Sequence, residues 1–148
     1  MDIRNRLLGL IRVGLDSSFL LSNGIDPKQI SDNSNKSILI RGCDPEMGRL
    51  AIELLTPVLG NPEIVAVTND DEFIIELKKK KWSVMFFAPG ACRFNSTNSP
   101  IPGSRPHTDG WGLTEYKALV KRHQGKYIKI VETTDETEII HLLIKALS

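Results

Sequence analysis

The sequence predicts an α/β fold: a three-layer sandwich in which a four-stranded parallel sheet lies between helices. Two observations predict it. From residue 37 onward, short apolar runs alternate with amphipathic segments of helical spacing, as in strands and helices joined by right-handed crossovers. The apolar run 83–87 shows no alternation, which indicates a strand buried on both faces. The domain is therefore flavodoxin-like or Rossmann-like, with 2-1-3-4 as the simplest strand order, and an N-terminal helix precedes it.

The chain divides into two parts at the start of the first predicted strand. Residues 1–36 combine a predicted amphipathic helix with a polar linker, and residues 37–148 form the α/β domain. Leu7, Leu10 and Ile11 fall on one face of that helix, because residues three and four apart share a face. This apolar face either covers its own domain or docks on a protein partner or a membrane surface.

Local signals predict each element of the domain. The first helix has Asp44 at its N-cap and Pro45 at its first position, where both residue types are favoured, and Pro57 ends or kinks its last turn. Polar residues cap two later helices, at 68–71 and 133–135. The predicted strands are residues 37–42, 63–67, 83–87 and 127–131. Four helices are predicted. In chain order they span residues 46–59, the stretch from the cap at 68–71 to residue 81, residues 114–123, and the stretch from the cap at 133–135 to residue 147.

Residues 88–112 contain too many prolines and glycines for a regular element. Loops this long in a compact domain are usually functional or disordered. The segment follows the third strand, so we expect it to lie over Cys43 at the carboxyl edge of the sheet. It either forms a lid or docking surface that includes Trp111, or brings cationic side chains to an anion beside Cys43. Those side chains are Arg93, Arg105 and His107.

The turn after the first strand carries a cysteine and an arginine separated by five residues, Cys43 and Arg49. This spacing resembles the Cys-x5-Arg loop of low-molecular-weight protein tyrosine phosphatases. The resemblance implies Cys43 as the nucleophile, Arg49 as the phosphate clamp and Asp109 as the general acid. The turn also resembles the strand-tip cysteine of the IIB components of sugar phosphotransferase systems, where a pair like Met47-Gly48 opens the helix. A helix N-terminus lowers the pKa of a cysteine and binds anions, which suits either chemistry.

Other residues of the same turn favour a different function. Leu50 stands where the phosphatase pattern has serine or threonine, and Asp44 and Glu46 bring negative charge to the place where a phosphate has to bind. The turn therefore lacks a complete catalytic set.

Composition excludes several other classes. The net charge of +1 gives no support for nucleic-acid binding, and no apolar run is long enough to span a membrane. No secretory signal precedes the domain, so an intracellular location with reduced thiols is expected for Cys43 and Cys92. Neither a metal-ligand spacing nor a dinucleotide fingerprint is present, and no cofactor is expected.

We therefore expect a non-catalytic binding or assembly module, such as an accessory subunit. It presents the N-terminal helix and the segment 88–112 to a protein partner or to a second copy of the chain. The residues expected to contact the partner are Leu7, Leu10, Ile11 and Trp111, and those expected to bind a small anion at the first turn are Arg49, Arg93, Arg105 and His107. The alternative is a cysteine-dependent phosphatase or phosphoryl carrier that uses Cys43, Arg49 and Asp109.

Overall fold

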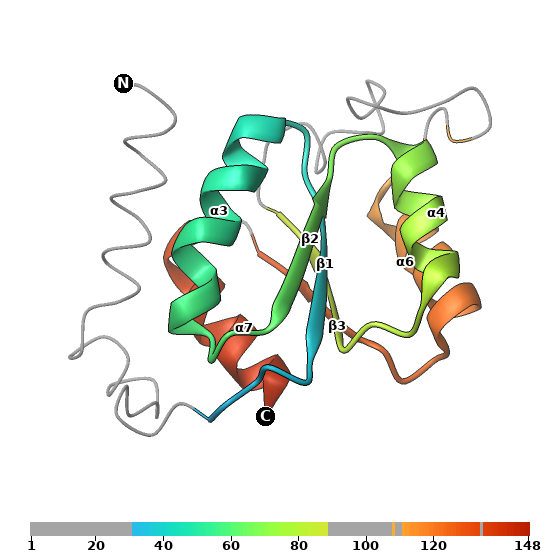
Figure 1. Cartoon of the computed structure of the whole chain (residues 1–148). Coiled ribbons are helices and arrows are strands. Elements are labelled where there is room, and N and C mark those ends of the chain that lie inside the picture. The colour runs from blue at the N-terminus through green and yellow to red at the C-terminus, as the bar shows by residue number, and fades with distance from the viewer. Residues whose placement is uncertain (1–30, 89–107, 109–110, 134) are drawn as a thin grey trace.

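The computed structural model describes residues 31–88, 108, 111–133 and 135–148 (Figure 1). Within them, four strands form one parallel sheet in the order β2-β1-β3-β4. This confirms the predicted fold class and strand order. The strands are β1 (Ser37–Arg41), β2 (Glu63–Val67), β3 (Val84–Phe87) and β4 (Lys129–Glu132).

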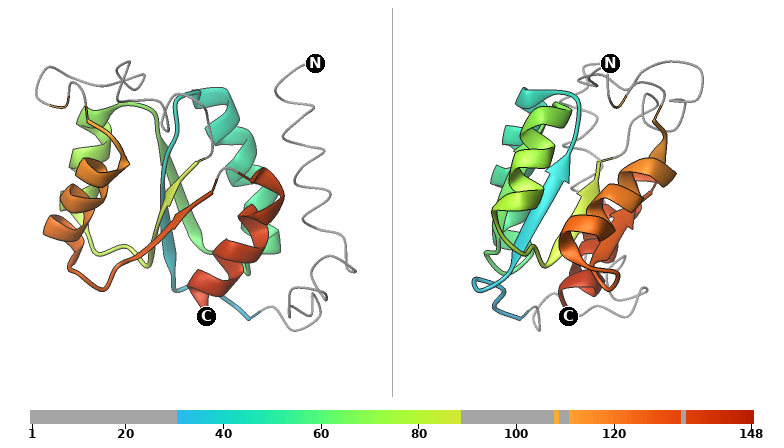
Figure 2. Two further views of the ribbon diagram at one scale, coloured as in Figure 1. Left: turned by 180° about the vertical axis from the view of Figure 1, so that it is seen from behind. Right: turned by 90° about the vertical axis from the view of Figure 1, so that its right-hand side faces the viewer.

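Helices cover both faces of the sheet (Figures 1 and 2). α3 and α7 pack on one face, and α4 and α6 on the other. The chain changes face because the crossover from β1 to β2 runs in one direction along the sheet, and the crossovers to β3 and β4 run in the other. The helices are α3 (Pro45–Val58), α4 (Asp70–Lys79), α6 (Leu113–Gln124) and α7 (Ile139–Leu147), with a short 3-10 helix, η3 (Glu136–Glu138), ahead of α7.

The start of α3 follows from its sequence. Asp44 Oδ1 accepts a hydrogen bond from the Glu46 backbone N–H at 3.0 Å, and Pro45 occupies the first turn. Pro57 lies inside the helix, which ends one residue later at Val58. A proline removes a backbone donor and clashes with the preceding turn, so the predicted stop at Pro57 is confirmed to within one residue.

The largest differences from the predicted bounds occur in the last third of the chain. β4 begins at Lys129, two residues later than predicted, because the preceding turn closes with a hydrogen bond from Ile128 N to Gly125 O at 3.4 Å. The last helix does not start directly at its cap, because the 3-10 turn η3 intervenes. These differences move the element ends and leave the topology unchanged.

The core consists of two apolar layers, one on each side of the sheet. Ile38 and Ile40 of β1 point into the layer with α3 and α7, and Leu39 points into the layer with α4 and α6. All four residues of β3 are buried, as predicted for a strand covered on both faces. Burying one such side chain contributes about 1.5 to 3 kcal/mol.

The chain enters β1 through a close contact with the end of α3. Asn33 N donates to Gly60 O at 2.7 Å, and Asn33 Nδ2 donates to Leu59 O at 2.8 Å. Gly60 has a φ of +86°, and a Cβ at this position would lie 2.1 Å from Ser31 O. A side chain therefore cannot be accommodated here, and this contact fixes the start of the domain against α3.

The predicted N-terminal helix and most of the segment 88–112 lie outside the described residues. No helix among the residues that are described is long and apolar enough to cross a membrane.

Candidate functional site

The candidate site is the carboxyl edge of the sheet between β1 and β3. The strand order reverses there, because β1 leads to β2 on one side and β3 leads to β4 on the other. In open α/β sheets, ligands bind at such a switch point. Ala88 N donates to Arg41 O at 3.2 Å, so the segment 88–112 leaves from the same edge as Cys43, as the parallel sheet requires.

A buried ion pair lies at this edge. Arg41, the last residue of β1, is 1% exposed, and Asp70, the first residue of α4, is 0% exposed. Arg41 Nε and Nη2 donate to Asp70 Oδ1 at 3.1 and 2.9 Å. Arg41 Nη1 also donates to the backbone oxygen of Gly42. Removing two charges from water is costly unless their remaining hydrogen-bonding groups are also satisfied.

The second carboxylate oxygen of Asp70 is also hydrogen-bonded. Thr108 Oγ1 and the hydroxyl of Tyr116 each donate to Asp70 Oδ2 at 2.7 Å. Burial, with the hydrogen bond to Asp70 as the second cause, raises the pKa of Tyr116 above its ordinary value. We call Arg41, Asp70, Thr108 and Tyr116 the Asp70 network. It joins β1, α4, α6 and the segment 88–112.

The Asp70 network fixes the returning end of the segment 88–112. Thr108 is 1% exposed and bonded to Asp70. Trp111 N donates to Thr108 O at 3.1 Å, and the Trp111 ring packs edge-on against Tyr116 with 5.4 Å between centroids. Both the beginning and the end of the segment are therefore held close to Arg41.

The first strand–helix turn holds its own carboxylate. Cys43 is exposed at this turn. The backbone N–H of Glu46, which a bound anion would use, donates instead to the side chain of Asp44. The turn is thus capped by a negative group of the protein itself.

Arg49 lies on the exposed side of α3 between two glutamates. It donates to Glu46 at 2.6 Å and to Glu53 at 3.1 Å, with its side chain 56% exposed. The hydrogen bond and charge of Glu46, and then the charge of Glu53, raise the pKa of Arg49. Its guanidinium is therefore engaged by residues three and four positions away on its own helix.

Only some of the predicted site residues fall within the described part of the chain. Of the predicted partner and anion sites, the structure describes Trp111, which is half-buried on Tyr116, and Arg49. In the part of the chain that is described, no three histidine, cysteine, aspartate or glutamate side chains are close enough together to hold a metal ion. The residues that lie outside the described ranges are Leu7, Leu10, Ile11, Cys92, Arg93, Arg105, His107 and Asp109.

Sequence reasoning missed the Asp70 network. The available signal is Arg41, a charged residue two positions after Leu39 in a buried strand and hence on the same face. A charge at such a position needs a buried partner. Asp70, 29 residues away, follows the helix cap Asn69 and gives no sign of burial in the sequence.

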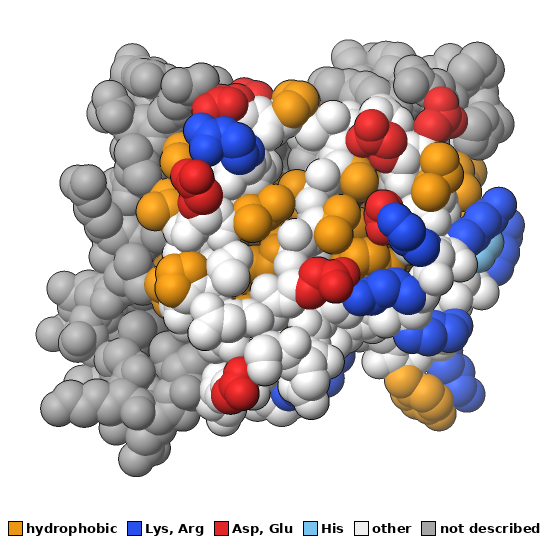
Figure 3. All heavy atoms as spheres, in the orientation of Figure 1, with side chains coloured by type: hydrophobic (Ala, Val, Ile, Leu, Met, Phe, Trp, Pro, Cys, Tyr) orange, Lys and Arg blue, Asp and Glu red, His pale blue; other side chains and the backbone are white. Residues whose placement is uncertain are grey.

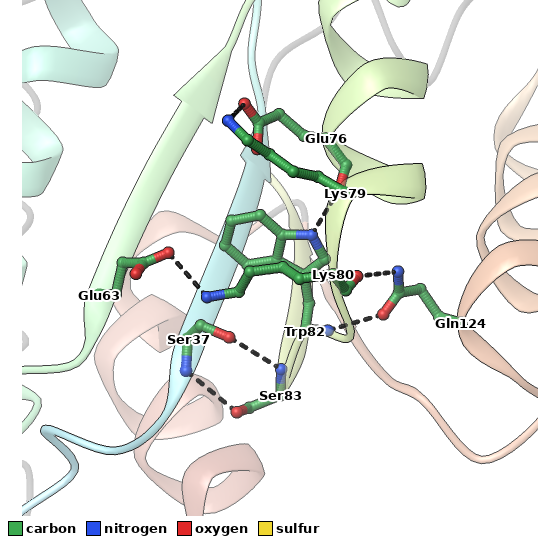
Figure 4. Close-up of polar contacts among 8 residues, drawn as sticks. All are labelled: Ser37, Glu63, Glu76, Lys79, Lys80, Trp82, Ser83 and Gln124. Atoms are coloured by element: carbon green, nitrogen blue, oxygen red, sulfur yellow. Dashed lines mark hydrogen bonds and ion pairs between the residues drawn. The ribbon is translucent and has the colours of Figure 1, made fainter.

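The amino edge of the sheet carries a second polar cluster, centred on Gln124 (Figure 4). Gln124 Oε1 accepts from Trp82 N at 2.7 Å, and its Nε2 donates to Leu77 O and Lys80 O at 2.8 and 2.9 Å. Trp82 Nε1 donates to Glu76 O at 2.8 Å. This cluster joins the ends of α4 and α6 to the start of β3.

An open pocket of about 400 Å³ lies beside this cluster. Two lysines line it, and both already bind the end of α7: Lys36 Nζ donates to Leu147 O, and Lys129 Nζ donates to Ser148 O at 3.0 Å. The pocket therefore offers no cationic group that is directed at a ligand.

Comparison with known proteins adds no relative. The chain matches no protein-family model, and no curated protein or solved structure is significantly similar to it.

Proposed function

We propose that this protein is a non-catalytic binding or assembly module that presents the segment 88–112, together with the N-terminal segment, to a protein partner. The observation that carries the proposal is the use made of the buried charges at the carboxyl edge. Arg41 forms an ion pair with Asp70 Oδ1, and Asp70 Oδ2 accepts hydrogen bonds from Thr108 and Tyr116. The switch point thus serves as an anchor for the segment.

The first turn supports the same proposal. Phosphate chemistry with Cys43 needs open backbone amides and a cationic clamp. Here Asp44 occupies the Glu46 amide, and Arg49 is bonded to Glu46 and Glu53. A phosphate dianion that approaches this turn therefore meets carboxylates in place of open amides and a cationic clamp.

Photo-crosslinking of the full chain tests the proposal. A benzoylphenylalanine placed at Phe94, inside the segment, is expected to give a discrete protein adduct in an extract of the source cells. The same group at Lys121, on the exposed side of α6, is the control and is expected to give none. Thr108→Val removes the bond to Asp70 and is expected to weaken the adduct at Phe94 while the far-ultraviolet spectrum stays unchanged.

Enzyme assays test the alternative directly. Under our proposal, hydrolysis of an aryl phosphate is no faster with the wild type than with Cys43→Ser or Arg49→Gln. Turnover that depends on Cys43, combined with the absence of a segment-specific adduct, would overturn the proposal.

A further inference from the structure

The free edge of β2 carries a further surface. In the part of the chain that is described, β2 is the outermost strand on its side of the sheet. Figure 3 views the molecule from this side and shows apolar side chains gathered across the middle of the face, between α3 and α4. The half-buried residues Ile64, Val65 and Ala66 belong to this strand, and Ile75 on α4 is 60% exposed.

The backbone of β2 has hydrogen-bonding groups directed outward. Glu63 N donates to Lys36 O at 3.0 Å, and Val67 O accepts from Gly42 N at 2.9 Å, so the odd-numbered residues of β2 face β1. Successive residues of a strand turn their N–H and C=O groups to opposite sides. Ile64 and Ala66 therefore direct theirs to the free edge. β2 contains no proline and pairs with β1 in an unbroken register, and such an edge is a template for another strand.

The charges on α4 show what kind of strand-bearing partner fits. Glu72, Ile75, Glu76 and Lys79 have the spacing i, i+3, i+4 and i+7 and share one side of the helix. Figure 4 shows Glu76 and Lys79 on the side of α4 toward β2, where their side chains form an ion pair at 3.4 Å. This side is acidic at the amino end, apolar at Ile75 and basic at the carboxyl end.

Such a pattern is complementary to itself when two copies run antiparallel. Residues 72 and 79 are equally distant from the midpoint of the pattern, so Glu72 of one copy faces Lys79 of the other. Ile75 and Glu76 flank the midpoint, so Ile75 of one copy faces Glu76 of the other. On β2, the same symmetry places Val65 opposite Val65 of the second copy, since it is the central residue of Glu63–Val67. A two-fold axis requires a surface of this kind.

We propose that a second copy of this chain binds along β2. The two β2 strands pair antiparallel about a two-fold axis, join the two sheets into one, and bring the two α4 helices together on one face. The interface lies on the side edge of the sheet and uses the exposed side of α4, whereas Asp70 at the start of this helix is buried. It does not depend on the function proposed above for the segment 88–112.

Replacing the central apolar side chain tests the interface. The full chain is expected to sediment as a dimer at micromolar concentration. Ile75→Glu places a glutamate opposite Glu76 of the other copy and removes apolar burial, so the dimer Kd is expected to rise by about tenfold or more. Tyr127→Glu is the matched control, because Tyr127 is also a large exposed side chain, at 85%, but lies before β4. It is expected to leave the Kd unchanged.

A charge swap on α4 tests the geometry. Glu72→Lys and Lys79→Glu each place like charges opposite one another in both symmetry-related contacts, and each is expected to weaken the dimer severalfold. The double variant Glu72→Lys/Lys79→Glu restores opposite charges across the axis and is expected to dimerise more tightly than either single variant. Its recovery is partial, because Lys79 also pairs with Glu76 of its own helix.

Two results would overturn this proposal. One is a wild-type chain that stays monomeric up to about 100 µM, well above the Kd range of specific interfaces. If removing residues 1–30 then produced a dimer, the edge would be covered by the protein's own N-terminal segment. The other is a failure of the variants to follow the geometry: either the Kd responds to Tyr127→Glu as much as to Ile75→Glu, or the double charge swap dimerises no more tightly than the single variants.

Discussion

The two edges of the sheet hold the neighbouring helices and loops in place by different chemistry. At the carboxyl edge, the Asp70 network uses a buried ion pair with two hydroxyl donors. At the amino edge, the neutral amide of Gln124 bonds to backbone groups of α4 and β3. A buried charge depends on every partner it has, because any loss leaves it uncompensated. A half-exposed amide loses only individual hydrogen bonds, which water replaces in part. We therefore expect the carboxyl edge to be the more sensitive of the two.

The largest effect is expected from Asp70→Ala. The substitution leaves Arg41 buried without its counter-charge, and the free energy of unfolding is expected to fall by about 3 to 5 kcal/mol. Urea denaturation of the purified chain measures it. Asp71→Ala, at an exposed position on the same turn, is the control and is expected to change the same quantity by less than about 1 kcal/mol. Equal effects of the two substitutions would contradict the role of the Asp70 network.

Tyr116→Phe removes one donor from Asp70 and keeps the aromatic packing. Hydrogen bonds to charged groups contribute about 1.5 to 3 kcal/mol, and we expect a loss near the lower end because Arg41 and Thr108 remain bonded to the carboxylate. The same denaturation measurement applies. A loss below about 0.5 kcal/mol would mean that the hydroxyl of Tyr116 is not needed at the carboxyl edge.

Gln124→Ala tests the amino edge. It removes three hydrogen bonds, two of them part-buried and one exposed. Because none involves a charged group, we expect a loss of about 1 to 2 kcal/mol. Gln124→Glu keeps the acceptor for Trp82 N and removes the two donors, and its loss is expected to be smaller. If Gln124→Ala cost more than Asp70→Ala, the ranking of the two edges would be reversed.

High pH is expected to weaken the carboxyl edge selectively. The fold raises the pKa of Tyr116, whereas the unfolded chain has an ordinary value of about 10. Above that pH the unfolded chain loses the proton and the folded chain keeps it. Stability present below pH 10 is then lost as pH rises, by up to about 1.4 kcal/mol per pH unit. Denaturation between pH 9 and 11 is expected to show a steeper decline for the wild type than for Tyr116→Phe, and parallel curves would contradict this.

The smallest effect is expected from Glu63→Gln at the amino edge. The pair of Glu63 and Lys80, at 2.8 Å, is formed by side chains that are 56% and 38% exposed. Exposed pairs contribute about 0 to 1 kcal/mol, so we expect a change in unfolding free energy within about 0.5 kcal/mol. A loss greater than that of Gln124→Ala would show that surface charges stabilise the amino edge more than Gln124 does.

The fold could be predicted from sequence because its signals are local. The buried strand β3, the cap Asp44 and the stop near Pro57 each depend on neighbouring residues. The strand order followed from the general rules for crossovers. Element ends at β4 and α7 were less accurate, because the turn at Gly125 and the 3-10 turn η3 depend on how the chain packs.

The candidate site divides in the same way. The pairing of Arg41 with Asp70 joins residues that only the completed sheet and α4 bring together, so no local pattern contains it. The environment of Arg49 was accessible from sequence, because Glu46 and Glu53 stand three and four positions away and α-helical spacing brings them into contact. The spacing of Cys43 and Arg49 alone did not reveal that two glutamates engage Arg49.

The contact of Asn33 with Gly60 has a consequence for how the protein is attached to its surroundings. It fixes residues 31–33 at the amino edge, while the chain leaves β3 at the carboxyl edge, where Ala88 N donates to Arg41 O. The five residues of β1 separate these points by about 16 Å. One small ligand cannot readily reach both. Under the proposed function, the domain would hold two binding segments a fixed distance apart, so that one large partner could be bound at two places with a gain in avidity.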